Sequence, residues 1–277
     1  NYHKVLATAS VVKRFRELGY PGTVGCILNP EVTYPRSRAP HDLRAAEIYD
    51  LFYNRMFLDP LVHGVWPPEL LALLEQHQVT WETSEEDLAV IREHTVDELG
   101  INLYYPHRVK APSRAWHPHT PFHPAWYYEP FELPGRRMNA SRGWEIYPQI
   151  IFDMAMRIKN DYRNIPWFVA ESGMGVENEG QFRNSEGTIA DDYRIRFISE
   201  HLWQTLRARE AGANCHGYML WAFTDNVSPM NAFKNRYGLI EIDLQNHRAR
   251  RPKASAHWFR QLGERRELVL DIDDEYR

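Results

Sequence analysis

One glutamate stands at the end of a predicted buried strand. The apolar run 166–171 is too short for a helix, and it ends on Glu171, which Ser172 and Gly173 follow. The carboxyl ends of parallel strands are where α/β proteins bind ligands. We therefore expect the carboxylate to face a binding site and the two small residues to leave room for a substrate. The alternative interpretation is a structural glutamate that caps a helix or forms a salt bridge.

Polar and aromatic residues also stand at the ends of three other predicted buried strands, 23–28, 99–105 and 216–222. They are Asn29 after the first, Asn102 and Tyr104 in the second, and Trp221 with Asp225 and Asn226 at the third. Because the carboxyl ends of neighbouring parallel strands meet at one edge of a sheet, these side chains are expected to lie near Glu171. The face of Trp221 would stack well on a sugar ring, and core packing is the alternative interpretation.

Apolar residues at helical spacing predict helices around these strands. The predicted helices are 5–15, 42–57, 68–74, 144–162, 189–211 and 253–262, with Asp42 as a cap and a further helix after a capping box at Ser84. Strands that alternate with helices predict an α/β fold with a parallel sheet. No G-x-G-x-x-G or P-loop follows a strand, which favours a (β/α)8 barrel over a nucleotide-binding sheet. Four strands are half of those in such a barrel.

The composition excludes several classes of protein. Of 277 residues, 33 are Lys or Arg and 37 are Asp or Glu, so the formal net charge is −4 and there is no basic field for nucleic acid or an acidic membrane. The longest uncharged apolar stretch, 211–224, is shorter than the ~18 residues of a membrane span, and the chain does not open with a signal-peptide pattern. Cys26 and Cys215 suggest no disulfide framework. We therefore expect a cytoplasmic protein.

The strand-end motifs resemble those of family 1 glycoside hydrolases. In these enzymes the seventh barrel strand ends in a run like T-E-N-G, whose glutamate is the nucleophile, and residues 170–173 are similar to it. The sixth-strand N-Y-Y-like motif is similar to residues 102–104. The resemblance implies that Glu171 forms a covalent glycosyl-enzyme, that Tyr104 hydrogen-bonds and orients it, and that Asn102 and Trp221 contact the sugar.

Further motifs follow in the family's order. They are G-W-E-I-Y-P at 143–148, D-Y-R at 192–194 and G-Y-x-x-W-x-x-x-D-N at 217–226. The resemblance covers residues 1 to about 262, and it implies a (β/α)8 TIM barrel of which this chain supplies about strands 5 to 8. We expect residues 1–277 to form a single domain, the C-terminal half of the barrel, with the N-terminal half absent.

The segment 228–237 separates the branches of the family. Ordinary β-glucosidases have a run like D-N-F-E-W, in which a glutamate would repel a sugar phosphate, whereas this chain has Ser228. The 6-phospho-β-glycosidases hold the 6-phosphate with a Ser, a Lys and a Tyr, which match Ser228, Lys234 and Tyr237. A solvated basic turn is the alternative interpretation.

Two departures from the family pattern bear on this assignment. Asn235 occupies the usual place of the lysine, which leaves Arg236 as a further candidate for the phosphate contact. Pro229 replaces the tryptophan of the 6-phospho-β-galactosidase branch and favours 6-phosphoglucosides. The expected activity is the retaining hydrolysis of β-glucosidic bonds in 6-phosphorylated disaccharides or glucosides. The alternatives are a β-glucosidase or 6-phospho-β-galactosidase of the same family, and a non-catalytic sugar-binding barrel or inactive fragment.

The chain lacks the second carboxylate that this chemistry needs. Retaining glycosidases place two carboxyl groups about 5 to 5.5 Å apart. The family's acid/base glutamate stands in an N-E-P motif after the fourth strand, whereas Asn29-Pro30-Glu31 follows the strand that resembles the fifth. We expect the other half of the barrel, in the same or another chain, to supply it, and the isolated chain to be inactive.

No metal or other cofactor is expected. The histidines His117, His119 and His123 lie close together, but prolines interrupt them and no cysteine joins them. The family chemistry that the resemblance implies also needs no metal.

Overall fold

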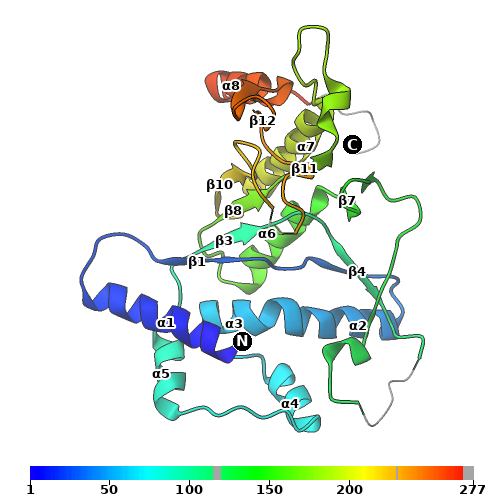
Figure 1. Ribbon diagram of the computed structural model, residues 1–277. Coiled ribbons are helices and arrows are strands. Elements are labelled where there is room, and N and C mark those ends of the chain that lie inside the picture. The colour runs from blue at the N-terminus through cyan, green and yellow to red at the C-terminus, as the bar shows by residue number, and fades with distance from the viewer. Residues whose placement is uncertain (115–119, 229, 271–277) are drawn as a thin grey trace. The chain divides into compact units, whose positions relative to one another are not determined.

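The computed structural model describes residues 1–114, 120–228 and 230–270, and the chain divides into two compact units (Figure 1). Unit 1 comprises residues 1–101, 106–135 and 157–167. Unit 2 comprises residues 102–105, 136–156 and 168 onward. The predictions for His117, His119 and Pro229 lie outside the described residues.

Unit 1 contains the first five α-helices. Its helices are α1 Tyr2–Glu17, α2 Pro40–Asp50, a π-helix Leu51–Arg55, α3 Met56–His63, α4 Pro68–Gln76, α5 Glu85–Glu93 and a 3₁₀ turn Pro124–Trp126. Its strands are β1 Gly25–Leu28, β2 Thr33–Pro35, β4 His107–Lys110, β5 Glu129–Pro130 and most of β3 Glu98–Asn102.

The strands β1 and β3 pair in parallel, with Gly25 opposite Glu98 and Leu28 opposite Ile101. On the other side of β3, the Leu99 amide donates to the Pro166 carbonyl at 3.0 Å. The prediction of a strand at 23–28 is therefore confirmed, but the expectation that it is buried is wrong. Its side chains alternate between half-buried and exposed, because they point to opposite faces of the sheet, and Ile27 is 60% exposed.

The helical segments α2, π and α3 run without a break from Pro40 to His63 (Figure 1). Their inner face packs Ile48, Leu51 and Phe52 against the leucines of α4. Asp42 is not the cap that we predicted, because the helix begins at Pro40, whose missing amide suits a first helical position. Asp42 instead accepts hydrogen bonds from Arg36, Ser37 and the Ala111 amide.

Unit 2 contains the remaining elements. Its helices are most of α6 Gln149–Asp161, a 3₁₀ turn Glu179–Phe182, α7 Asp192–Glu210 and α8 Ala254–Arg265. Its strands are β6 Met138–Asn139, β7 Trp144–Glu145, most of β8 Trp167–Ser172, β9 Val176–Glu177, β10 Cys215–Leu220, β11 Asn235–Arg236, β12 Ile240–Asp243 and β13 Ala249–Pro252.

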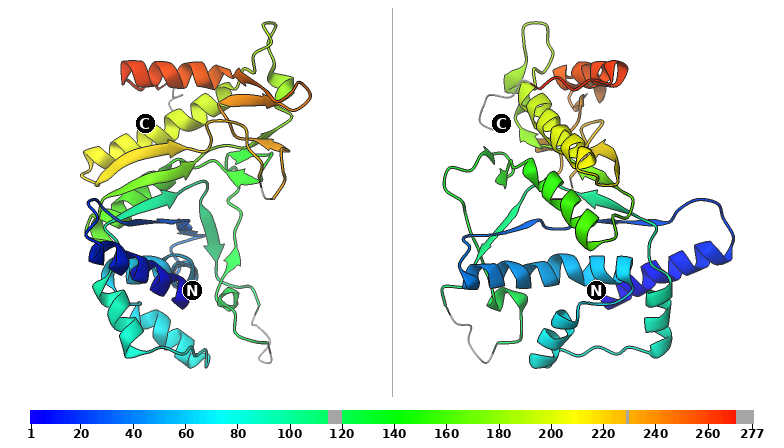
Figure 2. Two further views of the ribbon diagram at one scale, coloured as in Figure 1. Left: turned by 60° about the vertical axis from the view of Figure 1, so that its left-hand side comes forward. Right: turned by 180° about the vertical axis from the view of Figure 1, so that it is seen from behind.

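Strand β8 lies between the segment 102–105 and β10 in unit 2. The Leu103 amide donates to the Glu171 carbonyl at 2.8 Å on one side, and on the other the Trp221 amide donates to the Ser172 carbonyl at 2.9 Å. Strand β10 is the neighbour of β8 in the sheet. Helix α8 lies beside α7 and the β12–β13 hairpin (Figure 2). Buried Phe197, Ile198 and Leu239 fill the space among these elements.

The predicted helix at 144–162 begins five residues later than expected, at Gln149. Trp144 and Glu145 form β7, which pairs antiparallel with β6. The cause is Pro148, since a residue before proline is disfavoured in the helical conformation. By contrast, the predicted cap at Ser84 is confirmed, because Ser84 Oγ accepts the Asp87 amide at 3.1 Å at the start of α5.

The burial of His201 on α7 makes the stability of the chain depend on pH. The side chain is fully buried, its ring stacks on Phe197 with 3.9 Å between centroids, and Nδ1 lies 2.7 Å from the Phe197 carbonyl oxygen. Burial lowers the pKa of His201 to about 4. The unfolded histidine takes up its proton near pH ~6.5, before the folded one does. Stability is therefore lost as the pH falls from about 6.5 to about 4.

We expect the variant His201→Gln to lose about 2 kcal/mol less unfolding free energy than the wild type between pH 7.5 and pH 4.5. Urea unfolding at both pH values measures this. The control His257→Gln changes an exposed histidine on α8 and should follow the wild type. Equal losses in the two variants would show that His201 is not held neutral by burial.

Candidate active site

Glu171 and Tyr104 meet in unit 2, as the sequence predicts. Glu171 is the penultimate residue of β8, and Tyr104 follows β3 by two residues. The Tyr104 hydroxyl donates to Glu171 Oε2 at 2.6 Å. Both side chains are half-buried, and the backbones are joined by the Leu103 amide, which donates to the Glu171 carbonyl. The carboxylate is thus fixed by a short hydrogen bond at the carboxyl end of its strand.

The environment keeps the tyrosine protonated. Burial raises the pKa of Tyr104, and the neighbouring Glu171 carboxylate raises it further, since a phenolate beside a carboxylate would be repelled. Tyr104 is therefore a permanent hydrogen-bond donor to Glu171. One carboxylate oxygen is engaged in this bond, and the geometry suits a carboxylate nucleophile that is oriented by a tyrosine.

We had expected Gly173 to leave room for a substrate, and this expectation is wrong. A Cβ atom at Gly173 would lie 1.8 Å from the Trp221 carbonyl oxygen, so the backbone after β10 occupies the space that a side chain would need. Only glycine permits this approach. The consequence is that the end of β10 lies directly against the end of β8, which brings Trp221 next to the residues that follow Glu171.

Asn102 is the last residue of β3 and stands two positions before Tyr104. Its Oδ1 atom is buried and has no hydrogen-bond partner among the described residues. A buried polar atom without a partner is costly in a folded protein, and active sites are where such atoms are found. The amide is therefore suited to a polar group of a bound ligand, which agrees with its predicted role.

An aromatic ring that we did not assign to the site, that of Trp144, lies beside Tyr104. The Trp144 ring centre lies 5.3 Å from that of Tyr104 and 4.9 Å from that of Tyr105, on which it stacks. The Arg142 guanidinium carbon lies 4.3 Å from the Trp144 ring centre. Trp144 belongs to the G-W-E-I-Y-P motif, and its place in that motif could have indicated that it lies in the site. No local pattern marks Arg142.

Two of the predicted phosphate ligands lie against the segment that follows Glu171. Tyr237 is buried, and its ring covers Gly175, where a Cβ atom would approach the ring to 2.4 Å. Lys234 Nζ forms an ion pair with Glu177 Oε1 at 3.2 Å, and the lysine side chain is 65% exposed. Both contacts come from the antiparallel pairing of β9 with β11.

Ser228 lies in a turn before these residues. Its backbone amide and carbonyl both bond to Ala232, at 2.9 and 2.8 Å, and its Oγ accepts the Met230 amide at 3.3 Å. Arg236, the further candidate for the phosphate contact, faces Asp225. Its Nη1 atom lies 3.6 Å from Asp225 Oδ2 and donates to the Ile242 carbonyl at 3.3 Å.

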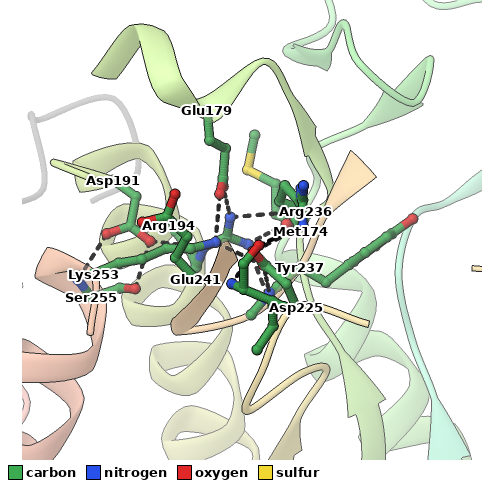
Figure 3. A network of polar contacts seen from close by, with 12 residues as sticks. Met174, Glu179, Asp191, Arg194, Asp225, Arg236, Tyr237, Glu241, Lys253 and Ser255 are labelled. Carbon is green, nitrogen blue, oxygen red and sulfur yellow. Dashed lines mark hydrogen bonds and ion pairs between the residues drawn. The ribbon is translucent and has the colours of Figure 1, made fainter. Parts of the chain in front are cut away.

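A buried network of charges holds these loops in unit 2 (Figure 3). Its centre is Arg194 on the first turn of α7, whose side chain is 1% exposed. Its guanidinium forms ion pairs with Glu179 and Asp191 and donates to the carbonyls of Met174, Arg236 and Tyr237. One side chain thus ties the segment after β8 to the segment that carries Tyr237.

A second buried cation, Lys253, completes the network (Figure 3). Its Nζ atom pairs with Glu179 and lies 2.9 Å from Asp225 Oδ1. Asp225 in turn accepts the amides of Gly238 and Ile242 at 3.0 and 3.3 Å. Asp225, which the sequence placed at the active-site edge, therefore has a structural role in fixing the loop after β10.

We expect Arg194→Met to lower the unfolding free energy by about 3–5 kcal/mol, because it leaves the buried Glu179 and Asp191 with less opposite charge. The matched control is Arg260→Met on α8, an exposed residue whose partner Glu264 lies 3.8 Å away, and there the change should stay within about 0.5 kcal/mol. Urea unfolding of both variants measures the difference. Similar losses in the two would contradict the role of the network.

Other functional features are absent from the described residues. Within 1–114, 120–228 and 230–270 no group of three or more His, Cys, Asp or Glu side chains is placed to bind a metal. No helix in this part of the chain is long and apolar enough to cross a membrane. Cys26 and Cys215 are free thiols, and burial raises the pKa of Cys215 to about 11, which makes it a packing residue rather than a nucleophile.

Comparison with known proteins identifies the family of this chain. The family model described as Glycosyl hydrolase family 1 matches residues 1–268. The chain belongs to glycosyl hydrolase family 1. This family 1 chain is 45% identical over 263 residues to 6-phospho-beta-glucosidase GmuD of Bacillus subtilis (strain 168), a match that covers 95% of the chain and 57% of GmuD. It is 31% identical over 284 residues to 6-phospho-beta-galactosidase of Staphylococcus aureus (strain JH9), covering 97% and 60%.

Solved structures of similar fold agree. The family 1 β-glucosidase from Thermotoga maritima superimposes with a TM-score of 0.83 at 25% identity, covering 97% of this chain and 57% of that one. The AHE enzyme from Alicyclobacillus herbarius gives 0.81 at 27% identity, covering 95% and 56%. The resemblance to family 1 and the prediction of part of a (β/α)8 barrel are confirmed. The family 1 chain spans 57–60% of the length of the curated relatives it matches.

Proposed function

We propose that the chain is part of an enzyme that hydrolyses β-glucosidic bonds in 6-phosphorylated glucosides with retention of configuration. The observation that carries the proposal is the 2.6 Å hydrogen bond from Tyr104 to Glu171 in a family 1 chain. Glu171 attacks the anomeric carbon and forms a glycosyl-enzyme, and Tyr104 orients the attacking carboxylate. Asn102 and Trp221 contact the sugar, the amide through hydrogen bonds and the indole by stacking.

The 6-phosphate is the proposed anchor of the substrate. Ser228 and Tyr237 offer hydroxyl donors, and Lys234 offers a positive charge that would exchange Glu177 for the phosphate. A fixed phosphate holds the scissile bond in place, so its binding energy contributes to positioning. The 45% identity to a protein named 6-phospho-beta-glucosidase, against 31% to one named 6-phospho-beta-galactosidase, supports a gluco preference. A charged sugar phosphate does not cross a bilayer unaided, so we also propose a cytoplasmic location.

The acid/base carboxylate is proposed to lie outside these residues. The sequence contains no N-E-P tripeptide, and Glu31, in the run Asn29-Pro30-Glu31 that has the same residues in another order, contacts Tyr49 and His107 in unit 1. Residues 1–277 would then form one domain with the remaining strands, supplied by the same or another chain. Covering the edges of β1 and β10 in this way also removes open sheet edges.

The test joins the 277-residue chain to the part of GmuD that it does not match, an assembly called the completed barrel below. Hydrolysis of 4-nitrophenyl 6-phospho-β-glucoside, 6-phospho-β-galactoside and β-glucoside is followed by absorbance. We expect the completed barrel to prefer the 6-phosphoglucoside and the isolated chain to be inactive. Normal turnover by the isolated chain would refute the role of outside residues, and a preference for the neutral glucoside would refute the phosphate anchor.

A further inference from the structure

The positive charges of the segment 228–237 are already engaged by carboxylates. Lys234 pairs with Glu177 and is largely exposed, and Arg236 faces Asp225. A phosphate carries up to two negative charges, and an exposed lysine that must leave a carboxylate contributes little net attraction. The proposed anchor therefore calls for another cation on the same side of unit 2.

Arg142 lies on a loop that is attached to this segment. The residue before it, Ser141, accepts the Glu177 amide at its Oγ, at 3.0 Å, and its carbonyl accepts Asn235 Nδ2 at 3.4 Å. The loop is further held by Asn139, whose Nδ2 donates to the Gly175 carbonyl at 2.9 Å. These three bonds place Arg142 beside β9 and β11, the two strands that carry Glu177 and Asn235.

The plane of the Arg142 guanidinium is fixed by an aromatic ring. Among the described residues, no carboxylate forms an ion pair with it. It stacks on Trp144, with its carbon 4.3 Å from the ring centre, and its buried Nε has no hydrogen-bond partner among the described residues. It also lies close to the Tyr237 hydroxyl. Burial raises the pKa of Tyr237, and the positive charge of Arg142 opposes that shift.

We propose that Arg142 binds the 6-phosphate of the substrate together with the Tyr237 hydroxyl, as a fourth member of the phosphate site. The inference rests on the proposed function. A planar guanidinium suits this role because it can offer two parallel N–H donors to phosphate oxygens, and stacking on Trp144 fixes its plane in advance. Trp144 also contacts Tyr104, so Arg142 links the phosphate site to the aromatic residues beside Glu171.

The test measures binding of glucose 6-phosphate and of glucose to the completed barrel, which contains all 277 residues of this chain, by isothermal titration calorimetry. Arg142→Gln removes the positive charge of the side chain. Arg142→Lys keeps the positive charge but lacks the two parallel N–H donors of a guanidinium. The matched control Arg209→Gln removes one exposed charge at the carboxyl end of α7, before β10 begins. Circular dichroism melting curves confirm that each variant is folded.

We expect Arg142→Gln to weaken binding of glucose 6-phosphate about tenfold and to leave binding of glucose unchanged. Arg142→Lys should fall between the wild type and Arg142→Gln, and Arg209→Gln should match the wild type. Wild-type affinity in Arg142→Gln, or an equal loss for both sugars, would overturn the assignment of Arg142 alone. A wild type that does not distinguish the two sugars would instead overturn the proposed function, and this inference with it.

Discussion

Replacing Glu171 by Gln in the completed barrel is expected to lower kcat for a 6-phospho-β-glucoside by at least about 10³-fold. The amide cannot attack the anomeric carbon, whereas the Tyr104 hydroxyl can still donate to its oxygen, so the fold of the site should persist. Initial rates with a chromogenic substrate measure the loss, and melting curves show whether the variant is folded.

Two further variants make the Glu171 result specific. Tyr104→Phe keeps the carboxylate but removes its donor, so a smaller loss, on the order of 10-fold to 10²-fold, is expected. Glu186→Gln changes an exposed glutamate in the loop before α7 and should retain full activity. If Glu171→Gln were as active as Glu186→Gln, Glu171 could not be the nucleophile.

Introducing a carboxylate at Ser228 is expected to reverse the substrate preference of the completed barrel. In Ser228→Glu, kcat/KM for the 6-phosphoglucoside should fall at least about 10²-fold, because two negative charges a few ångströms apart repel by several kcal/mol near a protein surface. The rate on the neutral glucoside should be unchanged or higher, since a carboxylate can accept hydrogen bonds from sugar hydroxyls.

The control Ser185→Glu adds the same charge in an exposed loop and should leave the ratio of the two rates unchanged. Raising the ionic strength should not abolish the effect of Ser228→Glu, because the charges would meet at short range. A Ser228→Glu enzyme that still preferred the phosphorylated substrate would show that the phosphate binds elsewhere.

The parts of the site that sequence could predict are those with a local signature. The strand 166–171 has an apolar run that stops at Glu171, and the second strand brings Tyr104 to the same end of the sheet. Strand order predicts that the two side chains lie near each other, once neighbouring strands are assumed to pair, whereas the hydrogen bond between them was implied by the resemblance to family 1. The Ser84 cap is local for the same reason.

The parts that the sequence did not predict depend on contacts between distant residues. Position 173 requires a glycine because the backbone of Trp221, which stands 48 positions later in the chain, lies against it. Lys234 pairs with Glu177 only because β9 and β11 pair. Arg142 stands near Tyr237 through bonds made by its neighbours, and its own residue type gives no indication of this. Such contacts leave no periodic pattern in a single sequence.

The helix boundaries show how local rules compete. Helical periodicity from Trp144 onward predicts a helix start there, but Pro148 and the pairing of β7 with β6 delay it to Gln149. Asp42 has a residue type typical of a cap, yet the proline at position 40 begins the helix and leaves Asp42 free to bond with Arg36 and Ser37.

The most direct test of the account is to trap the glycosyl-enzyme. The completed barrel is incubated with a 2-deoxy-2-fluoro-6-phospho-β-glucoside that carries a good leaving group, and the labelled protein is digested and sequenced by mass spectrometry. The account predicts one fluorosugar phosphate per molecule, attached as an ester to Glu171. A label on any other residue, or active enzyme that never becomes labelled, would contradict it.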